Sequence, residues 1–201
     1  MDWRTGQIGV GGDKPAQITK EMPCPRKIKS KGKSNMGSFS DPARAPPESA
    51  SSAVTDGLPD IIAGRLKVLF CGINPGVLAA ATGHHFAGRS NRFWRAIHLA
   101  GFTPQEIGPQ EDRAILKYGC GVTSLVKRPT ARADQLSPEE FTSAAAAFEL
   151  KVARYAPRFV AFLGKAAYCG LSGQRDIAWG LQSARMAGAT LWILPNPSGR
   201  N

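Results

Sequence analysis

Two asparagines in this sequence each follow a run of apolar residues and stand next to a proline. Asn74 lies in VLFCGINPG (68–76), and Asn196 lies in LWILPNPSG (191–199). An amide side chain donates and accepts hydrogen bonds but has no useful pKa, so it can hold a water but cannot act as a general base. Proline and glycine stiffen such turns and let backbone N–H groups face a ligand. The plainer alternative for Asn74 is that it only caps its turn.

The segment after the first turn, VLAAATGHHFAGRSNRFW (77–94), has residues suited to a flat ligand that carries a phosphate. Its small residues allow a flat ligand to approach closely, and Phe86 could stack on that ligand. Arg89 and Arg92 could bind a phosphate near the N-terminus of the following helix. A flat ring beside a phosphate describes a nucleotide taken out of a duplex. The two histidines before Phe86 fit a surface loop as well as a pocket.

Several other kinds of site and segment are not expected. The phosphate-binding patterns G-x-x-x-x-G-K-[ST] and G-x-G-x-x-G are both absent. The four cysteines are far apart and form no C-x-x-C pair, so a metal cluster is not predicted and a reducing compartment fits best. No run approaches ~18 apolar residues, so no membrane span is predicted. The first residues lack the apolar core of a secretory signal.

The remaining pattern indicates the elements that must position these residues. Buried strands are predicted over residues 67–72, 120–123, 158–163 and 191–194. Helices are predicted over residues 91–100, 109–118, 137–155 and 165–171. Strands that alternate with helices predict an α/β fold with a parallel sheet covered on both faces. Because ligands of such sheets bind beyond the carboxyl ends of the strands, Asn74 and Asn196 are expected to form opposite walls of one cleft.

The charge of the chain is strongly positive, at +11. Residues 1–57 hold 9 Lys and Arg against 6 Asp and Glu, and residues 58–201 hold 17 against 9. A basic tail and a basic body both suit a polyanion. Residues 1–57 are rich in Gly, Pro, Ser and Lys and lack apolar periodicity, so they are expected to be a disordered tail. Five Lys and Arg between residues 26 and 33 form either a phosphate-binding arm or a solvated segment without a specific role.

Four motifs together resemble one enzyme family. GINPG, GHHF-x-G-x-x-NRFW, CGVTSLVKRPT and LPNPSG, in this order, are similar to the mismatch-specific uracil/thymine-DNA glycosylases over about residues 65–201. The resemblance implies a glycosylase domain over residues 58–201 with the uracil-DNA glycosylase α/β fold, a short and mainly parallel sheet between helices, without metal or cofactor. Two features depart from the family. Arg200 stands where the family usually has a leucine wedge, and the family's further C-terminal helix is expected to be absent, since the sequence given stops at Asn201.

The resemblance also implies an activity. Such an enzyme flips uracil, and in some members thymine or other 5-substituted uracils, out of G·U and G·T mispairs in double-stranded DNA. It then hydrolyses the N-glycosidic bond and leaves an abasic site for base excision repair. The implied partners are mispaired duplex DNA and a downstream abasic-site endonuclease, and the protein is expected to act as a monomer. Its expected place is the cytoplasm or nucleoid of a bacterium, or the nucleus of a eukaryote.

The resemblance assigns roles to particular residues. Asn74 matches the catalytic asparagine that positions the water, and Phe86 matches the aromatic ring that stacks on the flipped base. The backbone N–H groups of Ile73 and Phe86 match donors to the base carbonyls, and Ala79 and Ala80 match positions that face carbon 5 of the base. The other implied substrate-binding residues are Pro75, Gly76, His85 and Asn196. The implied DNA-binding residues are Arg89, Asn91, Arg92, Lys127, Pro197, Ser198, Gly199 and Arg200.

Neither asparagine turn contains Asp or Glu, so the reaction cannot follow the two-carboxylate scheme of most glycoside hydrolases. A mainly dissociative reaction is expected, in which uracil leaves as an anion stabilised by backbone N–H groups. Because a true general base typically contributes ~10²–10⁴-fold, the enzyme is expected to be slow. No lysine lies in either turn, so no lyase activity is expected. Two alternatives stay open: a broad uracil glycosylase without mismatch preference, and a non-catalytic protein that binds damaged DNA.

Overall fold

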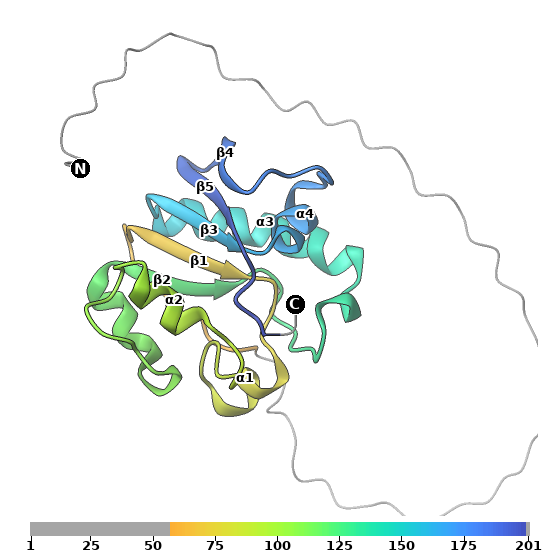
Figure 1. Ribbon diagram of the computed structural model, residues 1–201. Helices are drawn as coiled ribbons and strands as arrows, with labels where there is room; N and C mark the ends of the chain where they lie inside the picture. The colour runs from red at the N-terminus through yellow and green to blue at the C-terminus, as the bar shows by residue number, and fades with distance from the viewer. Residues whose placement is uncertain (1–56, 200–201) are drawn as a thin grey trace, which may run out of the picture. The chain divides into compact units, whose positions relative to one another are not determined.

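The computed structural model of this chain describes residues 57–199 (Figure 1). The expected N-terminal tail, its cluster of basic residues and Arg200 lie outside the described residues.

A single five-stranded sheet organises the described part of the chain, in the order β2-β1-β3-β5-β4. Strands β1, β2, β3 and β5 run parallel to one another, and β4 is antiparallel to β5. The strands are β1 (Val68–Gly72), β2 (Cys120–Ser124), β3 (Phe159–Leu163), β4 (Gly180–Met186) and β5 (Ala189–Leu194). The prediction of an α/β fold with a mainly parallel sheet is confirmed.

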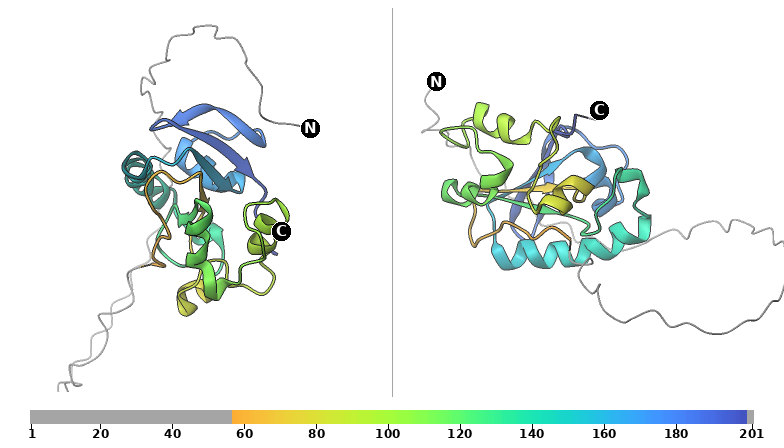
Figure 2. Two further views of the ribbon diagram at one scale, coloured as in Figure 1. Left: turned by 90° about the vertical axis from the view of Figure 1, so that its left-hand side faces the viewer. Right: turned by 90° about the horizontal axis from the view of Figure 1, so that it is seen from below.

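Helices cover both faces of this sheet, with α3 and α4 on one side and α2 and η1 on the other (Figures 1 and 2). The α-helices are α1 (Val77–Thr82), α2 (Phe93–Leu99), α3 (Pro138–Tyr155) and α4 (Lys165–Ser172). The 3₁₀ helices are η1 (Pro109–Tyr118) and η2 (Ala133–Gln135). None of the helices between residues 57 and 199 is long and apolar enough to cross a membrane.

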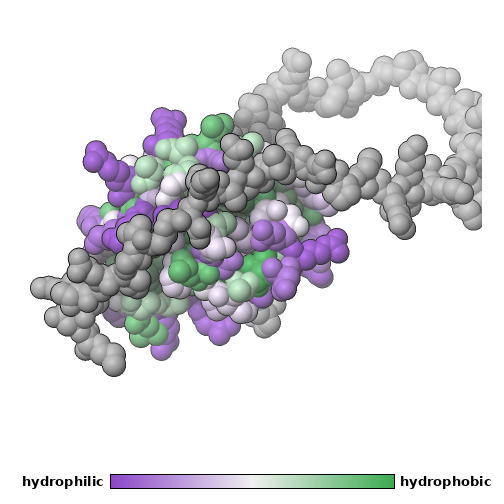
Figure 3. Space-filling model, turned by 90° about the horizontal axis from the view of Figure 1, so that it is seen from above, coloured by the Kyte–Doolittle hydropathy of each residue, from purple (hydrophilic) through white to green (hydrophobic). Residues whose placement is uncertain are grey.

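The central strand β3 shows why both faces need cover. Val160 and Phe162 pack into the core beneath α3 and α4, whereas Ala161 and Leu163 pack on the opposite side with α2 and η1. Successive side chains of a strand point to opposite faces, so an uninterrupted apolar run is buried on both. Figure 3 shows one face of the molecule, on which hydrophobic and hydrophilic residues are intermixed.

The structure departs from the expected elements at three places. Residues 109–118 form a 3₁₀ helix rather than an α-helix, and the backbone is kinked at Glu111, where it is non-helical. Helix α1 is absent from the sequence prediction because its six residues are too short a segment to show a helical period. Strand β4 is absent as well, because six of its seven residues are not buried and their sequence, GLQSARM, has no clear alternation.

The parallel strands bring the two asparagine turns to one edge of the sheet. Strand β3 lies between β1 and β5, so the ends of β1 and β5 are separated by only one strand. The first turn, residues 73–76, follows β1, and the second, residues 195–199, follows β5. The expectation that both turns occur at the carboxyl edge is confirmed.

Candidate functional site

A cavity of about 730 Å³ opens where the two turns meet. Its walls come from the first turn with α1, the loop before α2, the loop after β2, and the second turn. Most of the residues singled out in the sequence line it, namely Ile73, Asn74, Pro75, Gly76, Ala79, His85, Phe86, Arg89, Asn91, Asn196, Pro197, Ser198 and Gly199. Three others do not line it: Ala80, Arg92 and Lys127.

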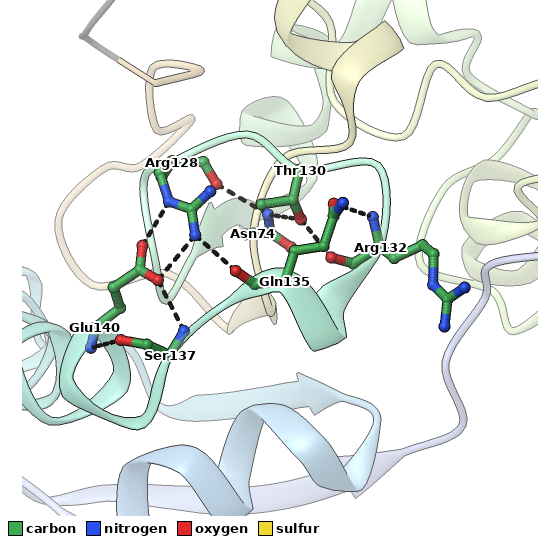
Figure 4. A network of polar contacts seen from close by, with 7 residues as sticks. All are labelled: Asn74, Arg128, Thr130, Arg132, Gln135, Ser137 and Glu140. Carbon is green, nitrogen blue, oxygen red and sulfur yellow. Dashed lines mark hydrogen bonds and ion pairs between the residues drawn. The ribbon is translucent and has the colours of Figure 1, made fainter. Parts of the chain in front are cut away.

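Asn74 has a fixed amide orientation. Its Nδ2 donates to the backbone carbonyl of Arg128 at 2.9 Å and to Thr130 Oγ1 at 2.7 Å (Figure 4). The Thr130 hydroxyl in turn donates to the carbonyl of Arg132 at 2.8 Å. Because a carbonyl oxygen only accepts hydrogen bonds, the NH₂ group must face Arg128. Within residues 57–199 no group donates to Asn74 Oδ1, so this oxygen remains to accept a hydrogen bond from a ligand or water.

The loop after β2 also holds the main chain of the first turn. Beyond the end of the β1–β2 ladder, Val126 N donates to Ile73 O at 2.9 Å and Thr130 N donates to Pro75 O at 3.1 Å. The turn that carries Asn74 is therefore supported along its length by a neighbouring segment. Sequence reasoning missed Thr130, although it lies in the KRPT motif, because nothing in the sequence shows which side chain its hydroxyl meets.

Phe86 presents one side of its ring to the cavity and the other to the core. Its ring stacks on Phe93 at a centroid distance of 4.0 Å and an angle of 29°. The backbone of Phe86 has a φ of 56°, a left-handed conformation that a bulky residue rarely adopts. Such strain persists only where the surroundings enforce it, and it clusters at functional sites.

His85 supplies the support that Phe86 needs. Its backbone N–H donates to the buried carboxylate of Asp112 at 2.9 Å, and its carbonyl accepts from Trp94 Nε1 at 3.0 Å. Its ring Nε2 lies 2.8 Å from the carbonyl of Pro59, which can only accept, so Nε2 carries the proton. Burial lowers the pKa of His85 and favours the neutral ring. His85 is 3% exposed and lines the cavity, so of the two alternatives, a surface loop and a pocket, it lies at the pocket, where it also supports Phe86.

The second turn uses its asparagine differently. Asn196 Oδ1 accepts a hydrogen bond from Ser198 N at 2.9 Å, which makes a local turn of the kind asparagine often forms. The carbonyl of Pro197 accepts from Arg92 N at 2.9 Å, which ties the turn to the start of α2. The two asparagines are thus not equivalent, because Oδ1 of Asn196 shapes its own turn whereas Nδ2 of Asn74 is anchored on another segment.

A close approach of the second turn to Ser90 gives a first prediction. A Cβ on Gly199 would lie 2.5 Å from Ser90 Cβ and 2.6 Å from Ser90 O, too near for either atom. Gly199→Ala is therefore expected to push the two segments apart and, if the chain binds the G·U duplex that the sequence resemblance implies, to weaken that binding about fivefold, from ~1 kcal/mol of overpacking. Gly64→Ala is the matched control, because nothing lies within 4 Å of a Cβ there. Equal affinities of both variants in a fluorescence-anisotropy titration would show that the contact is irrelevant to binding.

Lys127 takes part in a charged cluster away from the cavity. Its ammonium lies 2.6 Å from Asp60 Oδ1, and that of Lys151 lies 2.7 Å from Asp60 Oδ2. Burial acts to raise the pKa of Asp60, but hydrogen bonds from both lysines outweigh it and lower that pKa. The cluster anchors the residues before β1 against β2, where Thr123 also donates to Asp60. Lys127 therefore contributes net positive charge but does not reach the cavity.

The residues around the cavity are polar and aromatic groups suited to an organic ligand. Between residues 57 and 199, no group of three or more His, Cys, Asp or Glu could hold a metal ion. The cavity offers instead an amide oxygen, an aromatic ring and, at its rim, the exposed Arg89.

This arrangement agrees with the comparison of the chain with known protein families. Residues 59–201 match the family model of the uracil DNA glycosylase superfamily, which covers most of the chain. The members of this superfamily are DNA glycosylases, hydrolases that act in DNA repair. The protein described here belongs to the uracil DNA glycosylase superfamily.

Proposed function

We propose that this chain is a monofunctional DNA glycosylase that removes uracil, and thymine or other 5-substituted uracils, from G·U and G·T mispairs. The observation that carries the proposal is the pairing, in one cavity, of an aromatic ring with an asparagine whose amide donors are already occupied. A flipped base needs a surface to stack on, and the sugar carbon needs a water held by an acceptor. Phe86 and Asn74 Oδ1 supply these two functions.

The proposed reaction has two stages. The N-glycosidic bond breaks first, and uracil leaves as an anion that accepts hydrogen bonds from the backbone N–H groups of Ile73 and Phe86. The sugar cation that remains is attacked by the water on Asn74 Oδ1, and a proton passes to solvent. The ring of Phe86 is already stacked on Phe93, which lowers the cost of ordering the site during the reaction.

The mismatch preference rests on the second turn. Pro197, Ser198 and Gly199 lie beside the cavity and are tied to the start of α2, where they are suited to fill the space that a flipped nucleotide leaves. The partner in this proposal is double-stranded DNA, and the product passes to an abasic-site endonuclease. The protein works as a monomer in the compartment that holds the DNA, the nucleoid of a bacterium or the nucleus of a eukaryote.

A panel of oligonucleotides tests the substrate preference. The protein is incubated with G·U, A·U, G·T and single-stranded U substrates, and alkali then cleaves the abasic sites. The expected order of rates is G·U above both A·U and G·T, with single-stranded U lowest. Equal rates on all uracil substrates would show that the chain is a broad uracil glycosylase without mismatch preference. Binding of the duplex without any product would show that it is a non-catalytic protein that binds damaged DNA.

The small residues of α1 give a prediction about the base itself. Ala79 is 7% exposed and lines the cavity, whereas Ala80, the next residue of the same helix, does not line it. Ala79→Val is expected to lower the rate on G·T about tenfold more than the rate on G·U, because added bulk costs ~1–3 kcal/mol where the 5-methyl group would lie. Ala80→Val is the matched control and is expected to leave the ratio of the two rates unchanged. The same loss on both substrates in Ala79→Val would show that this wall does not face carbon 5.

A further inference from the structure

The Asn74 amide rests on a loop that has its own support. Arg128, whose carbonyl receives the amide, extends its guanidinium to Glu140 at the start of α3 (Figure 4). Nε donates to Glu140 Oε1 at 2.6 Å and Nη2 donates to Oε2 at 2.8 Å, which is a two-pronged ion pair. Nη2 also donates to the carbonyl of Gln135 at 2.8 Å, which closes the loop on itself. Arg128 therefore connects residues 128 and 135, the two ends of the loop segment that contacts Asn74, and ties this segment to α3.

Glu140 is itself fixed by the end of a helix. Its carboxylate accepts from Ser137 N at 2.8 Å, and Ser137 Oγ accepts from Glu140 N at 3.4 Å, the reciprocal capping box of α3. Hydrogen bonds from Arg128 and then from Ser137 lower the pKa of Glu140 to about 2. The carboxylate is therefore ionised at neutral pH, and the contact with Arg128 is charged there.

We propose that Arg128 and Glu140 are positioning residues that keep the Asn74 amide in its reactive orientation, an inference that rests on the proposed function. The path runs from the N-terminus of α3 through Glu140 and Arg128 to the carbonyl that accepts from Asn74 Nδ2. If that carbonyl moves, the amide keeps only the Thr130 hydroxyl as an acceptor, so it can rotate more easily and turn its NH₂ group toward the water. An NH₂ group cannot accept a hydrogen bond, so a rotated Asn74 no longer holds the nucleophile.

The exposure of the pair separates this role from simple stabilisation. The side chain of Arg128 is 50% exposed and that of Glu140 is 28% exposed. Ion pairs this open to water contribute little to stability. A neighbouring pair in the same loop, Arg132 and Asp134, is still more exposed, and neither of its side chains contacts Asn74 or Arg128. Loss of the first pair should therefore slow catalysis, and loss of the second should not.

The experiment is a mutational cycle on the single-turnover rate of G·U cleavage. Glu140→Gln keeps the length and the capping oxygen but removes the charge, Arg128→Ala removes the guanidinium, and Asp134→Asn is the matched control. The two test variants are expected to cleave about tenfold more slowly than wild type, with unchanged duplex affinity and melting temperature, and the control within twofold. In an Asn74→Ala background, Arg128→Ala is expected to have no further effect, because it acts only through Asn74.

The outcomes distinguish the inference from the function on which it rests. Cleavage by wild type with no loss in Arg128→Ala and Glu140→Gln would overturn the positioning role and leave the glycosylase intact. An equal further loss from Arg128→Ala with and without Asn74 would also overturn it, because a path through Asn74 was required. If wild type cleaves none of the uracil substrates, the proposed function fails first, and the positioning role fails with it.

Discussion

Asn74→Ala is expected to lower the single-turnover rate of uracil removal from a G·U duplex by about 10²–10³-fold, the usual effect of losing one preorganised polar group at a reacting centre. The variant loses a side-chain oxygen whose direction is fixed by two hydrogen bonds from the NH₂ group of the same amide. Binding of the duplex should change little, because Phe86 and the second turn remain in place. Stability should fall by only ~1–2 kcal/mol, since both lost contacts are ordinary hydrogen bonds.

Asn74→Asp is the informative companion to this variant. It keeps the shape of the side chain but replaces the NH₂ donor with an oxygen that faces the carbonyl of Arg128, which can only accept. The aspartate variant should therefore be less stable than the alanine variant in thermal melting, although aspartate caps turns about as well as asparagine. A wild-type melting temperature for Asn74→Asp would mean that the amide is not anchored on Arg128.

Phe86→Ala is expected to lower kcat/KM for the G·U duplex by about 10–100-fold, because stacking of one base on an aromatic ring is worth ~1–3 kcal/mol. The ring is held on Phe93 from behind, so its cavity side needs no rearrangement to receive a base. Phe86→Leu restores apolar bulk without a flat surface and should recover part of the stability but little of the activity.

The measurement is steady-state kinetics on G·U duplexes together with thermal melting of each variant. Melting matters here because Phe86 also packs against the core, and its removal costs stability independently of any base. If Phe86→Ala is folded and cleaves within threefold of wild type, the ring is part of the core and not a stacking surface.

Some parts of the site could be predicted because their signal is local in the sequence. An apolar run that ends at Asn-Pro predicts a strand followed by a rigid turn, and parallel strands bring such turns to one edge. Asn74 and Asn196 therefore meet at the cavity as expected. The same reasoning could not separate their roles, because the orientation of each amide depends on partners far along the chain. Arg128 and Thr130 lie more than fifty positions after Asn74.

Other parts could not be predicted for identifiable physical reasons. Ala79 and Ala80 are both small, but α1 turns by about 100° per residue, so only one of them lines the cavity. Asp112 is a buried carboxylate in a 3₁₀ segment that looks like an ordinary amphipathic helix in the sequence, and its partner is the backbone of His85. The positive charge of Lys127 suggests a contact with DNA, but its ammonium forms an ion pair with Asp60. Because Asp60 lies in a segment without any motif, the sequence gives no sign of this ion pair.

The most direct test of the central claim is mass spectrometry of the products from wild-type protein and a G·U duplex, without alkali or heat. The account predicts free uracil and a full-length strand that has lost only the base, because the chain hydrolyses the N-glycosidic bond and has no lysine in either turn to cleave the backbone. The same reaction with Asn74→Ala should release little uracil in the same time. Binding of the duplex without release of uracil, or release that is equally fast in Asn74→Ala, would contradict the account.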